Sequence, residues 1–554
     1  MMIKFKKARY LVIMVAILTV ITSGCGQSAA PGTGSGNNAA NPADTGKILR
    51  ISEASGGVID PASGADLASA TASVNMYDSL VYPNLDGEIV PSLAEDNWTV
   101  SDDGLVWDFT LRQGVKFHDG TELKASDVVF SVNRTLTLGE GYAYLFTGYL
   151  SGVEATGDYG VRFTLSKPFA PFLRILPRLY VLNEKLVMAN IAEGSYGEFG
   201  DYGKAWLAEH DAGSGAYYCE AMRVQDRLIM KKYDEYFGEF EANAPDTVEL
   251  ISGTETATIR TLMSSGQLEI SDQWQTNEAY TALDKIDGVE LGAFSTGQTL
   301  YLMLNTTKAP TDDIHIRRAI SHLIDYTQVT TVLFPGFHNA DSPVPGNIPG
   351  HSSKLTPYEF SLDKAKEEIA LSAYANRLNE VAVDIAWIAE VPDEEKLALL
   401  IQANAQQVGL KVNVVKVPWS TYVDNVVSAE TTPNAGVCFM AADYDEAGSM
   451  LYQRFHSDTA GTWQQIEWLN DSAIDEEITT SLTTMDQTAR FNIYDSIQKT
   501  VMDNVYGIAV ADSVEKHAYY DYIVWPAMEK ANRGEPVSAL LGYNYLFRTF
   551  QVNK

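Results

Sequence analysis

Two apolar runs, with an amphipathic stretch between them, predict a βαβ unit in the C-terminal half of the chain. Residues 381–388 (VAVDIAWI) and 410–417 (LKVNVVKV) are apolar or alternating runs of strand length. Between them, Pro392 and the acids that follow suit the first turn of a helix, and Gly409 suits its C-terminal cap. A strand, a helix and a strand at this spacing imply parallel strands and a right-handed crossover.

Other stretches show the 3.6-residue periodicity of helices. Residues 313–325 (DIHIRRAISHLID) carry their apolar side chains on one face. Ser361 is expected to cap a helix over residues 362–373, and Ser126 a helix over residues 127–135. Together with the βαβ unit, these helices predict an α/β protein.

The N-terminus predicts export. Four basic residues precede an apolar run at residues 11–21, which is too short to span a hydrocarbon core of roughly 30 Å. The run ends in Thr22-Ser-Gly-Cys25, which resembles the cleavage site of a lipoprotein signal peptidase, although such sites prefer an aliphatic residue where this chain has Thr22. The resemblance implies cleavage after Gly24 and a lipid on Cys25. The alternative is an ordinary secretory signal with an incidental cysteine.

The stretch that follows suits a tether. Residues 26–46 are rich in Gly, Ala, Asn, Ser and Pro and contain no aromatic residue, so they cannot build a core. A flexible chain of about 20 residues has an r.m.s. reach of roughly 25 Å. No later run of 18 apolar residues occurs, so we expect no membrane-spanning helix in the remainder.

Composition and charge narrow the class of protein. The chain has 554 residues, 45% of them hydrophobic, which is enough for two or more packed lobes. The formal charge is −32, and removal of residues 1–24, with four basic groups and no acid, makes it −36. Such a surface repels phosphate backbones, so no nucleic-acid partner is expected. Apart from Cys25, the cysteines are Cys219 and Cys438, which we interpret as two buried thiols, a disulfide being the alternative.

A block of short motifs near the start of the folded region resembles a known family. The motifs are Pro91-Ser-Leu-Ala-Glu95, Trp98, Ser101-Asp-Asp-Gly-Leu105, Phe109-Thr-Leu-Arg112, Gly114-Val-Lys-Phe-His-Asp-Gly120 and Ala125-Ser-Asp-Val-Val-Phe-Ser131. Their order resembles the family 5 extracellular solute-binding proteins of ABC importers, the oligopeptide-, dipeptide- and nickel-binding group. Most of the block reads as alternating strands and turns, so we expect it to build the scaffold rather than to contact ligand.

Further matches extend this resemblance over residues 47–554. They include Gly213-Ser-Gly-Ala-Tyr217, residues 262–270 (LMSSGQLEI), Tyr301-Leu-Met-Leu-Asn305 and Ala442-Asp443-Tyr444. The resemblance implies a two-lobed fold of the periplasmic-binding-protein type (type II, with an extra N-terminal subdomain) and a ligand cleft between the lobes. The implied segments are a signal peptide at 1–24, a lipidated Cys and linker at 25–46, lobe I at 47–300 and 510–554 with the extra subdomain at about 77–186, and lobe II at 301–509.

The family also implies a function. The chain would be an extracytoplasmic receptor, lipid-anchored to the cell membrane, that captures a small ligand by hinge closure and delivers it to an ABC permease and ATPase complex. A peptide is the favoured ligand and a monomer the expected state. No cofactor, metal or catalytic residue is expected.

Asp443 is the candidate anchor for the ligand. A peptide with varied side chains must be held by its backbone, and a carboxylate in a dry cleft can bind its terminal ammonium. Asp443 falls where the peptide-binding relatives carry such an Asp, whereas Asp445 and Glu446 are interpreted as surface acids. Further candidates for the cleft wall are Met440, Tyr444, Trp419 and Trp468. Relatives often have Trp at the position of Met440 and a Pro soon after the motif, so the side-chain pocket is expected to differ here.

Other functions remain as alternatives. The same fold can bind an oligosaccharide, an opine or a nickel chelate, and His456 is the residue that a metal hypothesis would use. A secreted, lipid-anchored hydrolase is the alternative from another class. The sequence contains no HExxH, GxSxG or P-loop motif to support it.

Overall fold

The computed structural model describes residues 46–53, 57–224, 226–389 and 391–554. The predicted signal peptide, Cys25 and, apart from Gly46, the linker lie outside these described residues. Within the described part of the chain, no helix has the length and apolarity needed to cross a bilayer.

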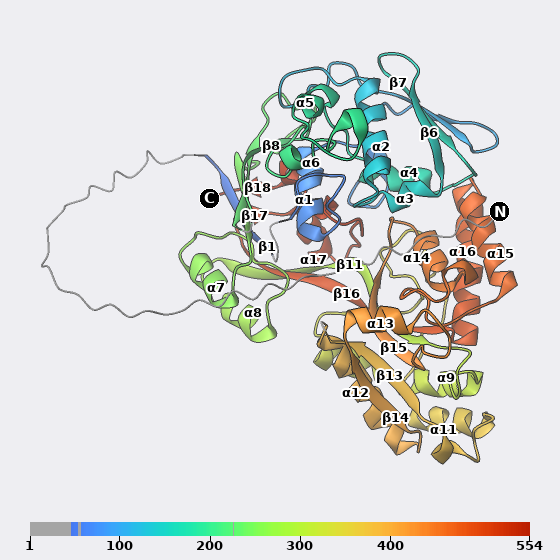
Figure 1. Cartoon of the computed structure of the whole chain (residues 1–554). Coiled ribbons are helices and arrows are strands. Elements are labelled where there is room, and N and C mark those ends of the chain that lie inside the picture. Colours follow the sequence, from blue (N-terminus) through green and yellow to red (C-terminus); the bar gives the residue numbers. More distant parts are fainter. Residues whose placement is uncertain (1–45, 54–56, 225, 390) are drawn as a thin grey trace, which may run out of the picture. The chain divides into compact units, whose positions relative to one another are not determined.

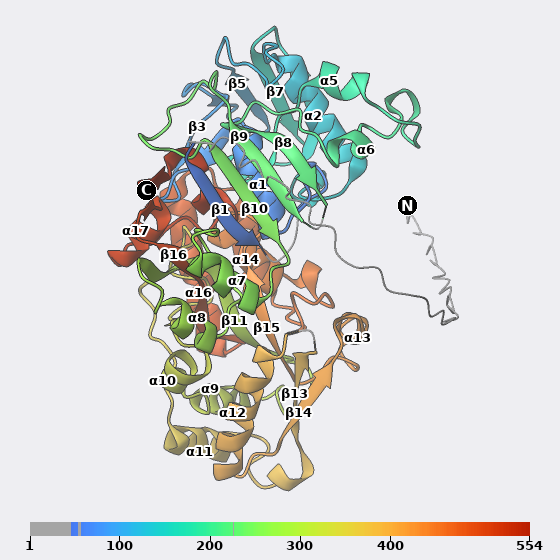
Figure 2. The same cartoon turned by 90° about the vertical axis from the view of Figure 1, so that its left-hand side faces the viewer.

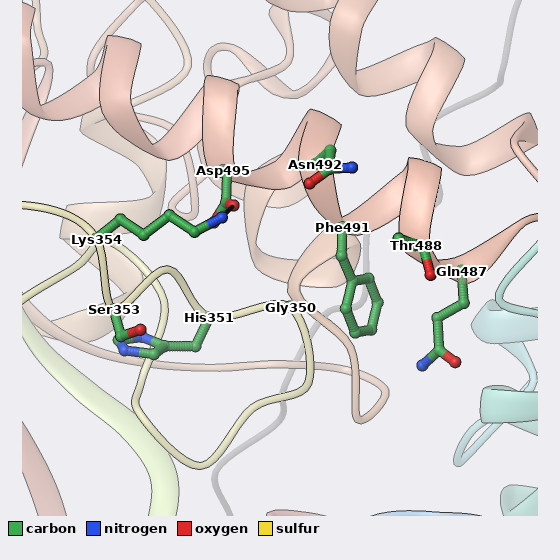
Figure 3. A pocket seen from close by; sticks show the side chains of 9 residues that line it. All are labelled: Gly350, His351, Ser353, Lys354, Gln487, Thr488, Phe491, Asn492 and Asp495. Atoms are coloured by element: carbon green, nitrogen blue, oxygen red, sulfur yellow. Dashed lines mark hydrogen bonds and ion pairs between the residues drawn. The ribbon is translucent and has the colours of Figure 1, made fainter.

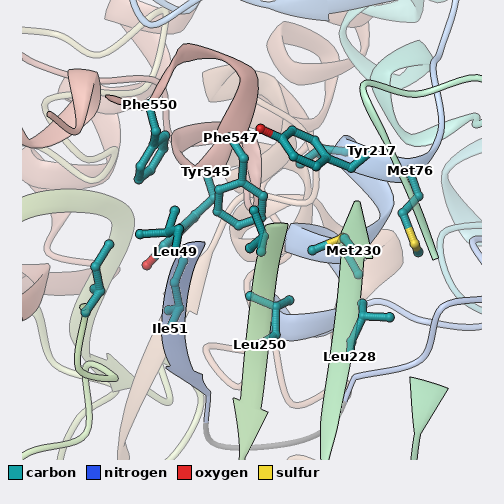
Figure 4. Packing of buried hydrophobic residues seen from close by; sticks show 14 of the residues in the cluster. Leu49, Ile51, Met76, Tyr217, Leu228, Met230, Leu250, Tyr545, Phe547 and Phe550 are labelled. Atoms are coloured by element: carbon teal, nitrogen blue, oxygen red, sulfur yellow. The ribbon is translucent and has the colours of Figure 1, made fainter. Parts of the chain in front are cut away.

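A four-stranded sheet in the order β1-β10-β9-β8 forms the first part of the fold (Figure 2). Its strands are β1 (Ile48–Glu53), β10 (Thr247–Ser252), β9 (Arg227–Lys232) and β8 (Tyr217–Arg223). Alternate side chains of these strands, such as Leu49, Leu250 and Met230, pack against Tyr545 and Phe547 (Figure 4). The C-terminal segment of the chain therefore completes the core of the sheet with which the described chain begins.

A six-stranded sheet in the order β12-β16-β11-β15-β13-β14 forms the second part. Its strands are β12 (His338–Asn339), β16 (Gly507–Tyr520), β11 (Val289–Leu304), β15 (Ala435–Ala441), β13 (Val383–Ile388) and β14 (Val412–Val417). Successive side chains of a strand point to opposite faces. Leu300 and Leu302 lie in one hydrophobic cluster, whereas Tyr301 and Met303 lie in another, so both faces of the sheet are buried.

β11 and β16 are the longest strands of the described residues, with 16 and 14 residues, and they pair antiparallel along most of their length (Figure 1). At one end Ile270 bridges both Ile51 of β1 and Tyr519 of β16. At the other end β11 pairs with β15 from Gln298 onward. The near ends of both strands also pack in the core of the first sheet, through Phe294 and Ala518, and the two strands span the positions at which the chain is expected to cross between lobes.

A third sheet, in the order β4-β5-β7-β6, lies in the segment that follows β3. Its strands are β4 (Thr99–Val100), β5 (Val106–Thr110), β7 (Gly160–Leu165) and β6 (Leu150–Ala155). Its core includes Phe109, Phe163 and Phe172, and it is continuous with Tyr444 and Ile474 from the far part of the chain. Two short strand pairs are β2 (Val81–Pro83) with β3 (Ile89–Pro91), and β17 (Ile523–Val524) with β18 (Gln551–Val552).

Helices cover these sheets. Those of the first and third sheets are α1 (Leu67–Met76), α2 (Ala125–Leu138), α3 (Tyr144–Thr147), α4 (Phe172–Ile175), α5 (Glu184–Ala189), α6 (Lys204–Leu207), α7 (Thr256–Ser264), α8 (Asn277–Leu283) and α17 (Pro526–Asn532). Those between β11 and β16 are α9 (Ile314–His322), α10 (Tyr326–Gln328), α11 (Leu362–Leu371), α12 (Asp393–Gln407), α13 (Trp419–Asn425), α14 (Ala447–Phe455), α15 (Ser472–Thr483) and α16 (Gln487–Asn504).

The predicted βαβ unit is confirmed. β13 pairs parallel with β14, α12 connects them, and Gly409 follows the helix with a φ of 78°. The N-cap of α11 is Ser361, as predicted, and its hydroxyl accepts a hydrogen bond from the Lys364 amide.

The prediction for α2 is wrong at its start. The helix begins at Ala125, one residue before the expected cap Ser126, and Lys124 occupies the N-cap position. The Asp127 carboxylate accepts a hydrogen bond from the Lys124 amide at 2.8 Å. This amide would otherwise have no partner at the start of the helix.

The two cysteines of the described chain are free thiols, so the disulfide alternative is not formed. Cys438 is buried, as expected, whereas Cys219 is only half-buried. Burial raises the pKa of each thiol to about 12, which keeps both protonated.

Candidate ligand-binding site

The loop between β15 and α14 carries three acidic side chains in four residues: Asp443, Asp445 and Glu446. It leaves the carboxyl end of β15, which lies between β11 and β13 in the six-stranded sheet. The Ala447 amide donates to the Pro349 carbonyl at 2.8 Å, and the Asp443 amide donates to the Ser449 hydroxyl at 2.8 Å. Both ends of the loop are therefore fixed by hydrogen bonds from their backbone amides.

The Asp443 carboxylate is half-buried and is held by neutral donors. The Tyr144 hydroxyl donates to its Oδ1 at 3.1 Å, and the Gln453 side-chain amide donates to its Oδ2. Burial raises the pKa of Asp443 to about 6, and the two hydrogen bonds oppose part of that rise. No Lys, Arg or His within the described residues forms an ion pair with this carboxylate, so its charge is available to a cation.

Asp445 and Glu446 are not surface acids, contrary to the prediction. Their exposed fractions are 2% and 0%. Glu446 is neutralised by Arg490, whose guanidinium donates to both carboxylate oxygens at 2.8 and 3.1 Å, and it also accepts from the Tyr494 hydroxyl. Acidic composition alone suggested exposure, but an arginine 44 residues further along the chain makes burial of this acid favourable.

Asp445 is buried with fewer partners. The Ser538 hydroxyl donates to its Oδ2 at 3.2 Å, whereas its Oδ1 has no hydrogen-bond partner among the described residues. Burial raises the pKa of Asp445 to about 6, and the positive charges of Arg174 and Arg178 oppose the rise.

Elements of the third-sheet region face this loop. Tyr144 is the first residue of α3, and Phe169 packs edge-on against Tyr444 with ring centroids 5.8 Å apart. The Arg174 guanidinium lies 3.6 Å from Glu446, and the Ala170 amide donates to the Leu482 carbonyl at 2.7 Å. These contacts join residues 144–174 to residues 443–482.

The other candidates from the sequence lie in different surroundings. Tyr444 is buried against Phe169, directly beside Asp443. Met440 is 1% exposed and belongs to the cluster that includes Tyr422 and Cys438. The structure therefore places Tyr444 beside Asp443, whereas the Met440 side chain points from β15 into the core.

The two tryptophans form separate groups. Trp419, the first residue of α13, packs edge-on against Trp463 at 5.3 Å. The Trp468 indole donates to the Thr432 hydroxyl at 2.9 Å, and its ring lies over Gly461. These contacts group each tryptophan with residues other than those that bind Asp443, so their role as cleft walls stays a prediction.

His456 ends α14, where its Nδ1 accepts from the Asp458 amide at 3.1 Å. Across the described ranges, no group of three or more His, Cys, Asp and Glu side chains is placed to hold a metal ion.

A polar hollow of about 470 Å³ lies between α16 and the loop at residues 350–354 (Figure 3). Lys354 and Asp495 form an ion pair across it, and Phe491 supplies its apolar wall. None of the residues predicted to bind ligand lines this hollow.

Tyr144, Gln453 and Arg174 are among the side chains near the loop that the sequence analysis missed. Tyr144 lies 299 residues before Asp443, and no periodicity or motif in the sequence pairs the two. Gln453 follows Asp443 by 10 residues on the next helix, so helical geometry after the loop could have suggested it.

The comparisons with known proteins bear on this arrangement. A family model described as bacterial extracellular solute-binding proteins, family 5 Middle, matches residues 88–462. The chain belongs to this family. The resemblance inferred from the motifs is thereby confirmed at the level of the family, and the members are binding proteins rather than enzymes.

Individual relatives agree with this assignment. The chain is 27% identical over 455 residues to the probable D,D-dipeptide-binding periplasmic protein of Escherichia coli, with 80% of this chain and 84% of the relative covered. It is 26% identical over 482 residues to heme-binding protein A of Haemophilus influenzae, with 80% and 82% covered. Its fold resembles an ABC transporter-associated periplasmic binding protein from Helicobacter pylori in complex with the peptide STSA, with a TM-score of 0.70, 24% identity, and 92% and 98% of the two chains covered. The predicted α/β periplasmic-binding-protein fold is confirmed.

Proposed function

We propose that this protein is the substrate-binding receptor of an ABC importer and that it captures a peptide through the ammonium group of the peptide. The observation that carries the proposal is the Asp443 carboxylate, which is half-buried, bound only by neutral donors and located between two parts of the fold. An ammonium ion placed there would form charge-assisted hydrogen bonds, which are stronger than neutral ones. The names of the dipeptide-binding relative and of the peptide complex support a peptide as ligand.

The proposed lobes follow the sequence boundaries. Lobe I comprises residues 47–300 and 510–554, with the extra subdomain at about 77–186, and lobe II comprises residues 301–509. The long strands β11 and β16 support this division, because Phe294 and Ala518 pack in the core of the first sheet, whereas Leu302 and Val510, further along the same two strands, pack in the core of the six-stranded sheet. Ligand release would separate Tyr144 from Asp443, since the two residues belong to different lobes, and ligand capture would bring them together by hinge closure.

The proposed cellular arrangement also follows from the sequence. Cys25 carries a lipid, residues 26–46 tether the folded part to the outer face of the membrane, and the monomeric receptor delivers its ligand to the permease and ATPase. The periplasmic relatives support the extracytoplasmic location.

The test compares ligands with and without a free amine. Ala-Ser-Ala and its N-acetyl form are titrated against the purified full-length protein, and binding is read from calorimetry and from thermal unfolding. A ligand present at 100 times its dissociation constant adds about 2.7 kcal/mol to the free energy of unfolding. We expect the free peptide to stabilise the protein and the acetylated form to bind at least about tenfold more weakly.

Variants locate the effect. Asp443→Asn keeps the size of the side chain and removes its charge, so it should abolish the preference for the free amine. Asp363→Asn is the matched control, because the Asp363 side chain is 91% exposed. Equal binding of both peptides by the wild type, or unchanged binding by Asp443→Asn, would show that Asp443 does not bind the amine. If heme or a sugar stabilises the protein and no peptide does, the ligand is not a peptide.

A further inference from the structure

Met485 is the most exposed methionine of the described residues. It lies in the turn between α15 and α16, and 37% of its surface is open to solvent, whereas the other methionines of the described ranges are buried or half-buried. Peroxides convert an accessible thioether to a sulfoxide. The thiols of Cys219 and Cys438 compete poorly for such an oxidant, because burial raises the pKa of each to about 12 and only a thiolate reacts readily.

The same side chain joins two parts of the fold. A Cβ atom added to Gly104 would lie 3.5 Å from the Met485 sulfur and 3.5 Å from Cβ of Pro168. Gly104 belongs to the turn between β4 and β5, and Pro168 follows β7, so both come from the third-sheet region. The contact continues along both segments, where the Ala170 amide donates to the Leu482 carbonyl at 2.7 Å.

Met485 is also tied to the acidic loop of the candidate site. The Arg490 guanidinium donates to the carbonyls of Thr484 and Met485 at 2.9 and 3.2 Å. The same guanidinium binds both carboxylate oxygens of Glu446, at 2.8 and 3.1 Å. One buried arginine thus fixes the position of Met485 relative to the loop that carries Asp443.

Oxidation changes what the Met485 side chain can contact. The thioether is apolar, whereas a sulfoxide carries an oxygen that accepts hydrogen bonds. Neither contact residue can donate one, because the Gly104 amide already donates to the Ser101 carbonyl at 2.8 Å and Pro168 has no N–H group. An unpaired oxygen held in this contact costs free energy, so we expect the sulfoxide to turn toward water. The contact between the two parts is then lost.

We infer that Met485 is an oxidation site whose modification shortens the time for which the receptor holds its ligand. A lone pair of the sulfur attacks one oxygen of a hydroperoxide, so that an S–O bond forms and the O–O bond breaks. The proton of the attacked oxygen moves to the departing one, and the peroxide is reduced to water or an alcohol while the thioether is oxidised to the sulfoxide. The inference rests on the proposed function, because loss of a contact made only in the closed receptor lowers the closed fraction and speeds release.

The first measurement needs neither a variant nor a ligand. The purified full-length protein is treated with hydrogen peroxide, and the oxidised methionines are identified at successive times by peptide mapping and mass spectrometry. Met485 should be oxidised before Met188 and Met222, which are half-buried. An oxidation rate for Met485 that is no higher than theirs overturns the inference, whatever the ligand is.

The second measurement follows peptide release after the peroxide has been removed. Stopped-flow displacement of a fluorescent peptide should show dissociation from the oxidised protein that is faster by about fourfold, the factor for one buried methylene group. Met485→Leu keeps an apolar side chain and has no sulfur, so it should release peptide at the untreated rate before and after peroxide. Equal sensitivity to peroxide in Met485→Leu and in the wild type overturns the inference, because another residue then causes the effect. An unchanged rate in protein whose Met485 is fully oxidised overturns it as well.

Met485→Gln provides a polar side chain without an oxidant. It should release peptide as fast as the oxidised wild type, and its rate should not respond to peroxide. Leu399→Gln is the matched control, because Leu399 is 47% exposed on α12 and makes the same apolar-to-polar change outside the contact. Equal release rates from the two Gln variants overturn the inference. If no peptide binds the untreated wild type, it is the proposed function that has failed.

Discussion

At the scale of single residues, the site is governed by how far burial alters the acidity of its carboxyl groups. Asp443 is half-buried between a tyrosine hydroxyl and a glutamine amide, and burial raises its pKa to about 6. A group with that pKa changes its charge just below neutral pH. The binding of an ammonium requires the ionised form, so affinity and acidity are linked.

Peptide affinity should therefore fall as the pH falls. Between about pH 6 and pH 7 Asp443 is ionised and the α-amine of the peptide, whose pKa is about 8, is protonated, so the dissociation constant should be nearly constant. Below about pH 6 the protein must lose a proton before it binds, and the dissociation constant should rise up to tenfold per pH unit. Calorimetry of the free-amine peptide between pH 5 and pH 7 measures this slope. Asp443→Asn should bind weakly and with much less dependence on pH, whereas an equally steep slope in the variant would assign the titration to another group.

At the scale of elements, one close approach of two backbones is set by glycine. Gly213 and Gly215 pass directly over the end of α1, where the Gly215 amide donates to the Met76 carbonyl at 3.0 Å. A Cβ atom added to Gly213 would lie 1.9 Å from the Met76 carbonyl oxygen, far inside van der Waals contact. Only a residue without a side chain permits this packing.

Gly213→Ala should accordingly destabilise the protein by about 1–3 kcal/mol or more, because the backbone itself has to move. The midpoint of urea unfolding should fall while the dependence of the free energy on urea stays the same. Gly148→Ala is the control, since Gly148 has a φ of −89° and nothing within 4 Å of an added Cβ. Equal midpoints for the two variants would mean that the loop at Gly213 adjusts without strain.

Local signals also decide what the sequence could predict at this scale. The βαβ unit was predictable because two apolar runs, three acids and a glycine all lie within 37 residues. The start of α2 was predicted wrongly because Ser126 is a good cap by type, whereas Asp127 satisfies the end of the helix from inside. The same limit applies to the site. Asp443 could be found through a motif, but Tyr144 and Arg174 lie more than 260 residues away from it, and no spacing along the chain predicts such pairs.

The buried acids show the physical reason. Asp445 and Glu446 lie in an acidic stretch of the kind that is typical of exposed loops. Their stabilising partners, Ser538 and Arg490, come from later parts of the chain. Burial of a charge depends on partners brought close by the fold, and these are known only once the fold is known.

At the scale of the whole folded region, the contacts between residues 144–174 and residues 443–482 should decide how long a ligand stays bound. Arg174 lies 3.6 Å from Glu446, and it donates to the Gly87 carbonyl on its own side. If these contacts form only in the closed state, their loss lowers the closed fraction, and the apparent dissociation constant rises by the same factor. The fold itself should tolerate the loss, because Glu446 keeps Arg490 and Tyr494 as partners.

Arg174→Gln should therefore speed peptide dissociation by roughly threefold to tenfold, the range for one partly buried ion pair, and should leave the unfolding midpoint of the free protein nearly unchanged. Stopped-flow displacement of a fluorescent peptide measures the dissociation rate. Arg162→Gln is the control, because its pair with Asp108 joins two strands of one sheet and does not connect the two parts. Identical dissociation rates in the two variants would mean that the Arg174 contact is the same in the bound and free states. The hinge would then close on the ligand through the bond between Tyr144 and Asp443 and the packing of Phe169 on Tyr444.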